Sequence, residues 1–328
     1  MSRPIRALGL FSGGLDSMLA CAVLREQGIE VNGVAFVTPF FGAERARKSA
    51  ARMALPLWEA DITDKFLPLI YAPPHGFGRW HNPCLDCRIL MLREAGAMME
   101  KLGFDFLFTG EVLGQRPLSQ HKGALALVAR ESGYSDLIIR PLSAKLLPPT
   151  KPELLGWVDR QRLLDLSGRS RKRQMALAER YGITDYPSPA GGCLLTDPGY
   201  SARLKELLGH TENATRQDLE LLKWGRHFRL PGGQKVIVGR THKENEAIAA
   251  LAAGSDLICK VKNFPGPTVL VRGKAGDDAL EQVAALAAAY SDAPEGTQVT
   301  VGCEKNGEEK LINLIAASKE GFKKWLIS

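Results

Sequence analysis

The hexapeptide Ser12-Gly13-Gly14-Leu15-Asp16-Ser17 decides the fold of this chain, because it joins an apolar run at 7–11 to a helical pattern at 18–24. This order predicts a strand, a glycine-rich turn and the N-terminus of a helix. The glycines let the backbone approach an anion, free amides at the helix start point toward it, and Ser12 and Ser17 add hydroxyl donors. An ordinary capped turn is the alternative, but the serines and the aspartate at this spacing favour a phosphate site. The Gly-Lys-Ser/Thr ending of a Walker loop is absent.

This string resembles the PP-loop of the ATP pyrophosphatases, enzymes that cleave ATP between the α- and β-phosphates to adenylate an oxygen. The resemblance therefore implies AMP transfer, with ATP and Mg²⁺ as cofactors. In that family the serines and glycines hold pyrophosphate and the aspartate helps to position magnesium. By resemblance those roles fall to Ser12, Gly13, Gly14 and Ser17 for pyrophosphate, and to Asp16 for Mg²⁺.

Composition and charge indicate which class of partner the chain binds. The chain has 328 residues, enough for about two domains. Lys and Arg number 43 against 36 Asp and Glu, and the excess is concentrated between 140 and 173. We expect this stretch to bind the phosphate backbone of RNA; the alternative is that it is a solvated helical face. The RNA-binding candidates in this stretch are Arg169, Arg171, Lys172 and Arg173.

The sequence contains no membrane signal. No apolar run approaches the ~20 residues of a membrane span, and no signal-peptide pattern precedes the first strand. We therefore expect a cytoplasmic protein with no membrane partner.

Strand-like and helical patterns alternate in the first part of the chain. This alternation predicts an α/β fold with a doubly wound parallel sheet, whose ligands bind at the carboxyl ends of the strands. The expected strands are 7–11, 31–37, 104–109 and 137–140, and the expected helices are 16–28, 43–54, 86–102, 112–131, 151–165 and 170–181.

A proline- and glycine-rich break at 186–193 separates this part from a smaller α+β module. In the module we expect hairpins turning at 231–233 and 305–307, strands near 256–272, and helices at about 200–209, 214–224, 243–253 and 277–290. The predicted domains are a PP-loop ATP-binding domain at 1–195 and an RNA-binding-like domain at 196–328.

Cys84 and Cys87 form a C-x-x-C pair at the start of the helix expected near 86–102, and Cys193 lies in a Gly-Gly-Cys turn. A helix dipole lowers the pKa of a nearby thiol, so we expect thiolates at the pair. A redox pair or half of a zinc site is possible from the spacing alone, and His75 or His81 could complete a zinc site.

The other three cysteines are expected to be structural. Cys21 lies on the apolar face of the first helix, and Cys259 and Cys303 lie within strand-like stretches. We expect all three to be core or half-buried thiols, because a free cysteine packs as a small hydrophobe and the compartment is reducing.

The reactive cysteines resemble those of the PP-loop tRNA thiolases, where a C-x-x-C pair and one distant cysteine hold a [4Fe-4S] cluster with one iron left open. The resemblance implies such a cluster on Cys84, Cys87 and Cys193. Three thiolates around four irons leave a site for sulfide or a substrate sulfur. The alternative that the same resemblance implies is a catalytic disulfide and persulfide pair on these cysteines.

Two further stretches resemble the ThiI-like tRNA thiouridine synthases. The segment Thr109-Gly110-Glu111-Val112-Leu113-Gly114-Gln115-Arg116-Pro117-Leu118-Ser119-Gln120 is similar to a Thr-Gly-x-x-x-Gly-Gln-x-x-Ser-Gln segment of that family, and Arg140-Pro141-Leu142 to its Arg-Pro-Leu strand end. This resemblance covers about residues 5 to 195. It implies that Gly110 and Gln115 line the nucleotide site.

The C-terminal module resembles the RNA-binding domain of the NFACT proteins in the stretch Phe264-Pro265-Gly266-Pro267-Thr268-Val269-Leu270-Val271-Arg272-Gly273. The resemblance implies RNA contacts from basic residues on or next to strands, with Lys262 and Arg272 as the candidates. A plain solubilising surface is the alternative.

Together these resemblances imply an ATP-dependent tRNA sulfurtransferase. The enzyme would adenylate a uridine carbonyl and replace its oxygen by sulfur, with 4-thiouridine as the family's default product and sulfide or a cysteine desulfurase as the sulfur donor. Asp16, Cys84, Cys87 and Cys193 are the expected catalytic residues. The alternatives are a PP-loop amide or lysidine-type ligase, and a zinc-stabilised RNA-binding module with a degenerate nucleotide site.

Overall fold

The computed structural model describes residues 3–188, 192–273 and 277–327. The chain divides into two compact units, unit 1 from Met1 to Thr196 and unit 2 from Asp197 to Ser328. Residues 189–191 of the predicted break lie outside the described residues. Within the described ranges, no helix is long and apolar enough to cross a membrane.

Unit 1 alternates strands and helices along the chain. Its elements are β1 (Arg6–Leu10), α1 (Leu15–Arg25), β2 (Glu30–Val37), α2 (Glu44–Arg52), β3 (Leu57–Asp61), α3 (Thr63–Tyr71), α4 (Cys84–Leu102), β4 (Phe106–Thr109), α5 (Lys122–Ser132), β5 (Ile138–Ile139), α6 (Lys151–Leu154) and α7 (Lys172–Arg180). Short 3₁₀ turns lie at Ser135–Leu137, Ala144–Leu146, Arg160–Arg162 and Leu194–Thr196.

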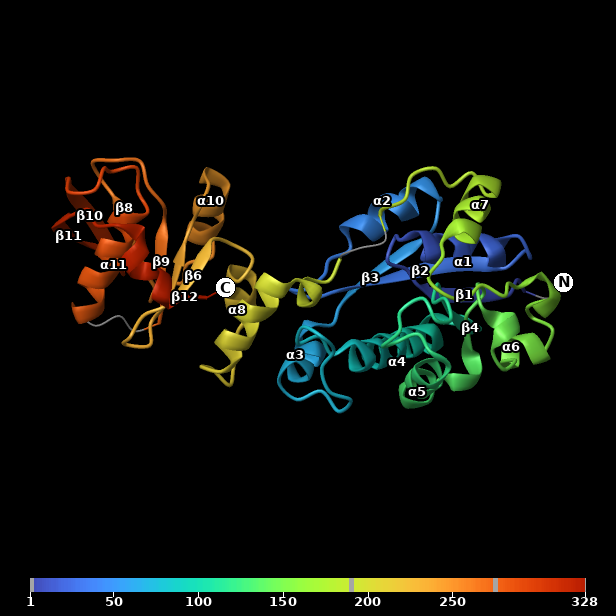
Figure 1. Cartoon of the computed structure of the whole chain (residues 1–328). Helices are drawn as coiled ribbons and strands as arrows, with labels where there is room; N and C mark the ends of the chain where they lie inside the picture. Colours follow the sequence, from blue (N-terminus) through green and yellow to red (C-terminus); the bar gives the residue numbers. More distant parts are fainter. Residues whose placement is uncertain (1–2, 189–191, 274–276, 328) are drawn as a thin grey trace. The chain divides into compact units, whose positions relative to one another are not determined.

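The sheet of unit 1 has the strand order β3-β2-β1-β4-β5, and all its pairings are parallel. Figure 1 shows α1, α2 and α7 on one face of this sheet and α3, α4 and α5 on the other. Two apolar cores fill these layers, one on the face of α1 and one on the face of α4. The predicted doubly wound parallel sheet is confirmed.

Four elements of unit 1 differ from the prediction. Strand β3 was missed because its sequence Leu-Trp-Glu-Ala-Asp is half-exposed at the sheet edge, and α3 because it contains Pro68. The helix expected at 112–131 begins only at Lys122, because residues 112–121 form turns and an isolated bridge. The helix expected at 151–165 is the four-residue α6 followed by a 3₁₀ turn.

Unit 2 is an α+β unit built on an antiparallel sheet. Its elements are α8 (Pro198–Leu208), α9 (Arg216–Leu221), β6 (Arg226–Arg229), β7 (Lys235–Val238), α10 (His242–Ala250), β8 (Leu257–Val261), β9 (Val269–Arg272), α11 (Asp277–Ala289), β10 (Gln298–Lys305), β11 (Glu308–Ile315), a 3₁₀ turn (Lys319–Trp325) and β12 (Leu326–Ile327). The strand order is β11-β10-β8-β9-β7-β6-β12, and α11 packs its apolar face on this sheet. Both predicted hairpins, β6–β7 and β10–β11, are present.

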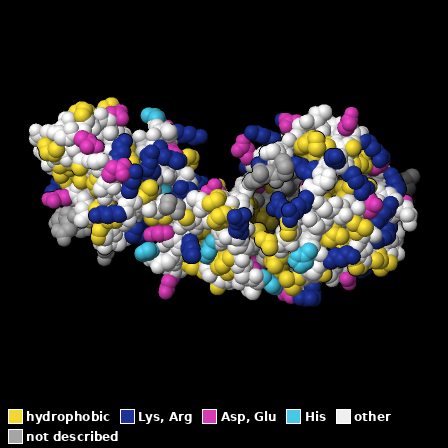
Figure 2. All heavy atoms as spheres, in the orientation of Figure 1, with side chains coloured by type: hydrophobic (Ala, Val, Ile, Leu, Met, Phe, Trp, Pro, Cys, Tyr) yellow, Lys and Arg dark blue, Asp and Glu magenta, His cyan; other side chains and the backbone are white. Residues whose placement is uncertain are grey.

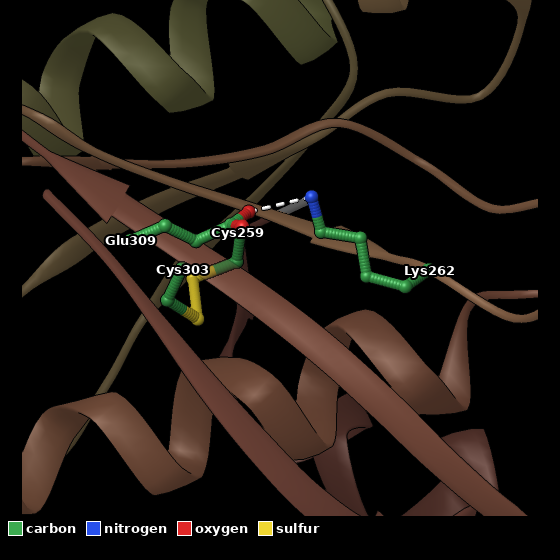
Figure 3. The surroundings of a disulfide bond; sticks show 4 residues. All are labelled: Cys259, Lys262, Cys303 and Glu309. Atoms are coloured by element: carbon green, nitrogen blue, oxygen red, sulfur yellow. Dashed lines mark ion pairs between the residues drawn. A yellow bond between two sulfur atoms is a disulfide. The ribbon is translucent and has the colours of Figure 1, made fainter. Parts of the chain in front are cut away.

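Cys259 and Cys303 require a correction. Both are buried as expected, but they are joined in a disulfide and are not free thiols (Figure 3). The cause is register: Cys259 on β8 lies directly opposite Cys303 on β10, with their Cα atoms 4.1 Å apart. Cys21 is the buried core thiol that the sequence predicted, and burial raises its pKa to about 12.

A buried ionic cluster fixes the chain that leaves β4. The Glu111 carboxylate accepts from Arg140 Nε at 2.9 Å and pairs with Arg88 Nη1 at 3.0 Å, and all three side chains are largely buried. Arg88 also donates to the Ser119 carbonyl at 2.8 Å, and Arg140 to the Leu125 carbonyl at 3.1 Å. Burial raises the pKa of Glu111, but the two guanidinium groups lower it by more, so the pKa lies below its ordinary value.

Glu111→Gln should therefore destabilise unit 1. Removing the carboxylate leaves two buried cations without a counter-charge, so we expect the free energy of unfolding at neutral pH to fall by about 3 kcal/mol. Because the pKa of Glu111 is lowered on folding, its contribution is present above the ordinary value of 4.5 and lost as the pH falls below it. Urea unfolding at neutral and acid pH measures both effects. Glu131→Gln, in an exposed pair with Arg130, is the control and should change little; an equal loss in the two variants would contradict this account.

Candidate nucleotide and sulfur site

The loop between β1 and α1 lies at the carboxyl end of a central strand. Gly13 has a φ of +70°, and a Cβ there would lie 2.5 Å from the Arg45 carbonyl oxygen of α2, so only glycine fits. Gly14 is the N-cap of α1, and no side chain caps this end. Ser12 is exposed, while the Ser17 hydroxyl donates to the Gly14 carbonyl at 2.8 Å. The free amides at this end of α1 are suited to an anion.

Asp16 lies in the first turn of α1 and is half-buried. Its Oδ2 accepts from Gln115 Nε2 at 3.0 Å, whereas its Oδ1 is buried and has no hydrogen-bond partner among the described residues. Burial raises the pKa of Asp16; the Gln115 hydrogen bond and the charges of Arg171 and Arg116 lower it by less. An unpartnered carboxylate oxygen is a ligand that Mg²⁺ prefers, so the residue fits the metal that the sequence implied.

The chain after β4 forms a wall of the same site. A Cβ at Gly110 would lie 2.6 Å from the backbone carbonyl of Asp16 and from the Ser17 amide, so the close approach requires glycine. The structure thus brings both residues of this segment that the sequence singled out, Gly110 and Gln115, to the first turn of α1.

The N-terminus of α7 also faces Asp16. Arg171 is the N-cap of α7, and its charge lowers the pKa of Asp16. The Arg171 Nε atom is buried and has no hydrogen-bond partner within the described residues. Gln174, one turn further along, is buried and also lowers the pKa of Asp16. Arg171 thus presents a guanidinium group to the nucleotide loop.

The three loop cysteines gather in unit 1. Cys84 is the first residue of α4, Cys87 lies one turn later, and Cys193 comes just before a 3₁₀ turn whose Leu194 amide donates to the Phe40 carbonyl at 2.9 Å. All three thiols are half-buried. Ionisation of Cys84 or Cys193 would raise the pKa of Cys87 further, so the three thiols lie within electrostatic range of one another.

The pKa values of two of these thiols correct the prediction. Burial raises the pKa of Cys87 far above its ordinary value, and it raises the pKa of Cys193 to about 11. The helix dipole therefore does not produce a thiolate at Cys87, because desolvation and the neighbouring thiols outweigh it. Arg116 opposes the rise at Cys193 and also lowers the pKa of Asp16, so its guanidinium lies within electrostatic range of both.

No group of three or more His, Cys, Asp or Glu side chains within the described residues is placed to hold a metal ion. The two histidines considered for a zinc site have other contacts. His75 Nδ1 is 2.7 Å from the Asp86 carboxylate, and His81 Nε2 is 2.9 Å from the Ile70 carbonyl.

The predicted RNA-binding residues have different surroundings. Arg169 and Lys172 are exposed, and Arg173 forms a surface ion pair with Asp165 at 2.5 Å. In unit 2, Lys262 pairs with Glu309 at 2.5 Å, as Figure 3 shows. Arg272 is largely buried and binds Asp218 at 2.7 Å and Asp256 at 2.5 Å.

The fold defines unit 1 as an α/β domain with a parallel five-stranded sheet, and the loop between β1 and α1 is its candidate nucleotide site. Comparison with known families is more specific. The family described as thiamine biosynthesis protein (ThiI) matches residues 5–145, and the family described as NFACT protein RNA binding domain matches residues 225–326. Residues 5–145 are thus similar to the ThiI family, and residues 225–326 are similar to the NFACT RNA-binding domain.

Relatives of known function support the same grouping. A tRNA sulfurtransferase of Desulfurococcus amylolyticus is 26% identical over 97% of this chain and 60% of its own length. A tRNA-specific 2-thiouridylase, MnmA 3 of Bacteroides fragilis, is 33% identical over 40% of this chain and 36% of its own. The chain thus spans 60% or less of each of these relatives.

Solved structures are more distant. One is a 4-thiouridine synthetase in complex with RNA and ATP, which is 20% identical to this chain and has a TM-score of 0.35. The matched region includes 66% of this chain and 52% of the synthetase chain. Another is an NMN synthetase from Francisella tularensis, which is 12% identical to this chain and has a TM-score of 0.27. The matched region includes 57% of this chain and 89% of the synthetase chain.

Sequence reasoning missed Arg116 and Gln174 and gave Arg171 to RNA. Arg116 directly follows Gln115 in the segment that the family resemblance marked, so that segment contained a signal for it. Gln174 gave none, because a glutamine one turn into a basic helix is indistinguishable from a solvated side chain until α7 is docked on α1.

Asp16→Asn should not destabilise the protein when nucleotide is absent. Folding raises the pKa of Asp16, so the protonated form is favoured; this contribution is complete below the ordinary value of 3.8 and is lost as the pH rises through the raised pKa. At neutral pH the buried carboxylate therefore costs stability, and the neutral amide should melt at the same or a higher temperature. Thermal unfolding at neutral pH and near pH 4 tests this. A lower melting temperature would make Asp16 a helix cap instead.

Proposed function

We propose that this chain is an ATP-dependent tRNA sulfurtransferase. The observation that carries the proposal is that unit 1 contains both the PP-loop, with the unpartnered Asp16 oxygen, and three thiols within electrostatic range of one another. Arg116 lies within electrostatic range of Asp16 and of Cys193. The ThiI-type and NFACT-type matches and the sulfurtransferase relative support the same reaction and the same substrate. By the family default, the product is 4-thiouridine.

In the proposed first step, a uridine carbonyl oxygen attacks the α-phosphorus of ATP and pyrophosphate leaves. The amides at the start of α1, with Ser12 and Ser17, hold the departing pyrophosphate, and Arg171 adds a positive charge beside it. Asp16 would hold Mg²⁺, which neutralises phosphate charge when bound. A sulfur nucleophile then adds to the activated carbon, and AMP leaves with the original oxygen.

The cysteines are proposed to bring the sulfur. Thiolates are ligands that iron–sulfur centres prefer, and three of them would leave one iron of a [4Fe-4S] cluster open for sulfide. The three thiols are not placed as a metal-ligand group among the described residues, so a cluster would require them to move closer together. The raised pKa values of Cys87 and Cys193 mean that the free thiols stay protonated, so a cationic partner or a proton acceptor must accompany their use. Arg116 supplies a cation at Cys193.

We propose that tRNA is held by exposed cations of unit 1, namely Arg169, Lys172 and Arg173, together with unit 2. Arg171 is assigned instead to the nucleotide. Tyrosine, tryptophan and basic side chains recur on unit 2, where Arg226 and Lys319 lie over the ring of Tyr290. Such pairs suit single-stranded RNA.

Incubation of the full chain with tRNA, ATP, Mg²⁺ and sulfide under anaerobic conditions should give AMP, pyrophosphate and thiolated tRNA, detected by nucleoside mass spectrometry. Cys87→Ser and Cys193→Ser should abolish thiolation while pyrophosphate release persists. Cys21→Ala, at the buried cysteine of α1, is the control and should keep both. Iron and acid-labile sulfide in anaerobically purified protein support the cluster.

Two results would contradict the proposal. Pyrophosphate release coupled to incorporation of glutamine or lysine would identify the ligase alternative. One tightly held zinc ion without ATP turnover would identify the RNA-binding module.

Variants at the neighbouring residues Arg171 and Lys172 can distinguish an effect on ATP chemistry from an effect on RNA binding. Arg171→Gln should lower the rate of pyrophosphate formation about tenfold, because it removes a cation that faces Asp16. Lys172→Gln, the same charge change at an exposed position, should leave that rate unchanged and weaken tRNA binding. Steady-state kinetics and a tRNA titration measure the two effects. If both variants behave alike, Arg171 does not belong to the nucleotide site.

A further inference from the structure

Unit 2 contains a cluster of cations that its carboxylates do not balance. Four cationic side chains and three carboxylates lie on α8 and its N-cap, the β6–β7 hairpin and the start of α10: Arg203, Arg229, Lys235 and Arg240 with Asp197, Glu206 and Glu244. Lys and Arg side chains also gather over the face of unit 2 that Figure 2 shows.

Most of these charges are paired. Arg229 and Lys235 lie directly opposite each other across the hairpin, where like charges repel. Glu206 of α8 joins them: it accepts from Arg229 Nε at 2.6 Å and from Lys235 Nζ. Arg240 pairs with Glu244, four residues later.

Arg203 forms no ion pair among the described residues, although the charge of Asp197 acts on it and opposes the fall of its pKa on burial. It precedes Glu206 by three residues on α8, so the two side chains share one face of the helix. Arg203 is half-buried, its Nε atom is buried, and neither a hydrogen-bond partner for that atom nor an ion pair for the side chain is found among the described residues. A guanidinium group in this state has lost water without gaining an ion pair, which costs free energy.

The electrostatics of the neighbouring groups place the other cations around Arg203. Burial lowers the pKa of Arg203, and among the neighbouring charges Asp197 opposes this most. Arg240 lowers the pKa further, so that it lies below its ordinary value although Glu244 also opposes the fall. Burial and the charges of Lys235 and Arg203 keep the pKa of His227 well below its ordinary value, so His227 is neutral and adds no charge. Burial likewise lowers the pKa of Lys235 to about 8.

The two cations of unit 2 that the sequence predicted to contact RNA form ion pairs, unlike Arg203. Arg272 binds two carboxylates and the Gln217 side chain, so its donors serve the interior of unit 2. Lys262 lies across Gly302 and pairs with Glu309, as the dashed line in Figure 3 marks. Arg203 differs from both because it forms no ion pair among the described residues.

We propose that Arg203, with Arg240 beside it, forms an anion site on unit 2 that binds a phosphodiester of the RNA backbone. The inference rests on the proposed function, which supplies the RNA. The guanidinium fork of arginine matches the paired oxygens of a phosphate, and the Arg240 side chain is 48% exposed, which leaves a solvent-facing side to the site. A free phosphate ion has the same chemistry, so the experiment must separate the two sources.

The test uses the full chain and fluorescently labelled tRNA, with anisotropy titrations across a range of salt concentrations. Arg203→Gln should weaken binding about tenfold and reduce the slope of log affinity against log salt by about one. Lys205→Gln is the matched control, since Lys205 is exposed on the same helix two residues later, about 200° around its axis. It should change affinity less than about twofold.

Two further measurements exclude misfolding and a different ligand. Arg203→Gln should melt no lower than the wild type, because it removes a half-buried charge that forms no ion pair among the described residues, and Arg203→Lys should retain part of the affinity. Wild-type affinity and salt slope in Arg203→Gln would overturn the inference. Protection of the wild type by inorganic phosphate, with RNA affinity independent of Arg203, would overturn it in favour of a free anion. Loss of thiolation in every assay, with Arg203-dependent RNA binding intact, would refute the enzyme but not this site.

Discussion

The approach of the chain after β4 to the first turn of α1 is the contact on which the site in unit 1 depends. Strands β1 and β4 are neighbours in a parallel sheet, so their carboxyl ends lie side by side. The backbone at Gly110 can reach Asp16 and Ser17 only because no side chain stands between them. That contact lets Gln115 bond to Asp16 and brings Arg116 into range of both Asp16 and Cys193. The ion pairs of Glu111 with Arg88 and Arg140 fix the same segment to α4 and to the end of β5.

Much of the fold could be predicted from the sequence, because apolar runs and glycine-rich turns mark the central strands. The hydrophobic pattern did not predict the segments whose conformation is set by tertiary contacts. Strand β3 is half-exposed at an edge, and residues 112–121 are fixed by contacts such as the Leu113 amide to the Ser143 hydroxyl at 2.9 Å, not by a helical period. A pairing such as Cys259 with Cys303 depends on the register of β8 against β10, which spacing along the chain does not encode.

The candidate site was predictable in part for a related physical reason. Glycine, serine and aspartate at fixed spacing describe a backbone shape, so the nucleotide loop and Gly110 could be found in the sequence. Cations are different, because their role depends on which carboxylates the fold places beside them. Arg272 carries the same charge as Arg203, yet one is clamped between Asp218 and Asp256 and the other has no such partner among the described residues. Thiol pKa values depend in the same way on burial, which at Cys87 outweighs its position near the start of α4.

Cys193 stands only four residues before Asp197, the first residue of unit 2. The third thiol therefore belongs to unit 1 and lies close, along the chain, to the junction with unit 2. An insertion at that junction would fall within a few residues of a side chain that is proposed to carry sulfur.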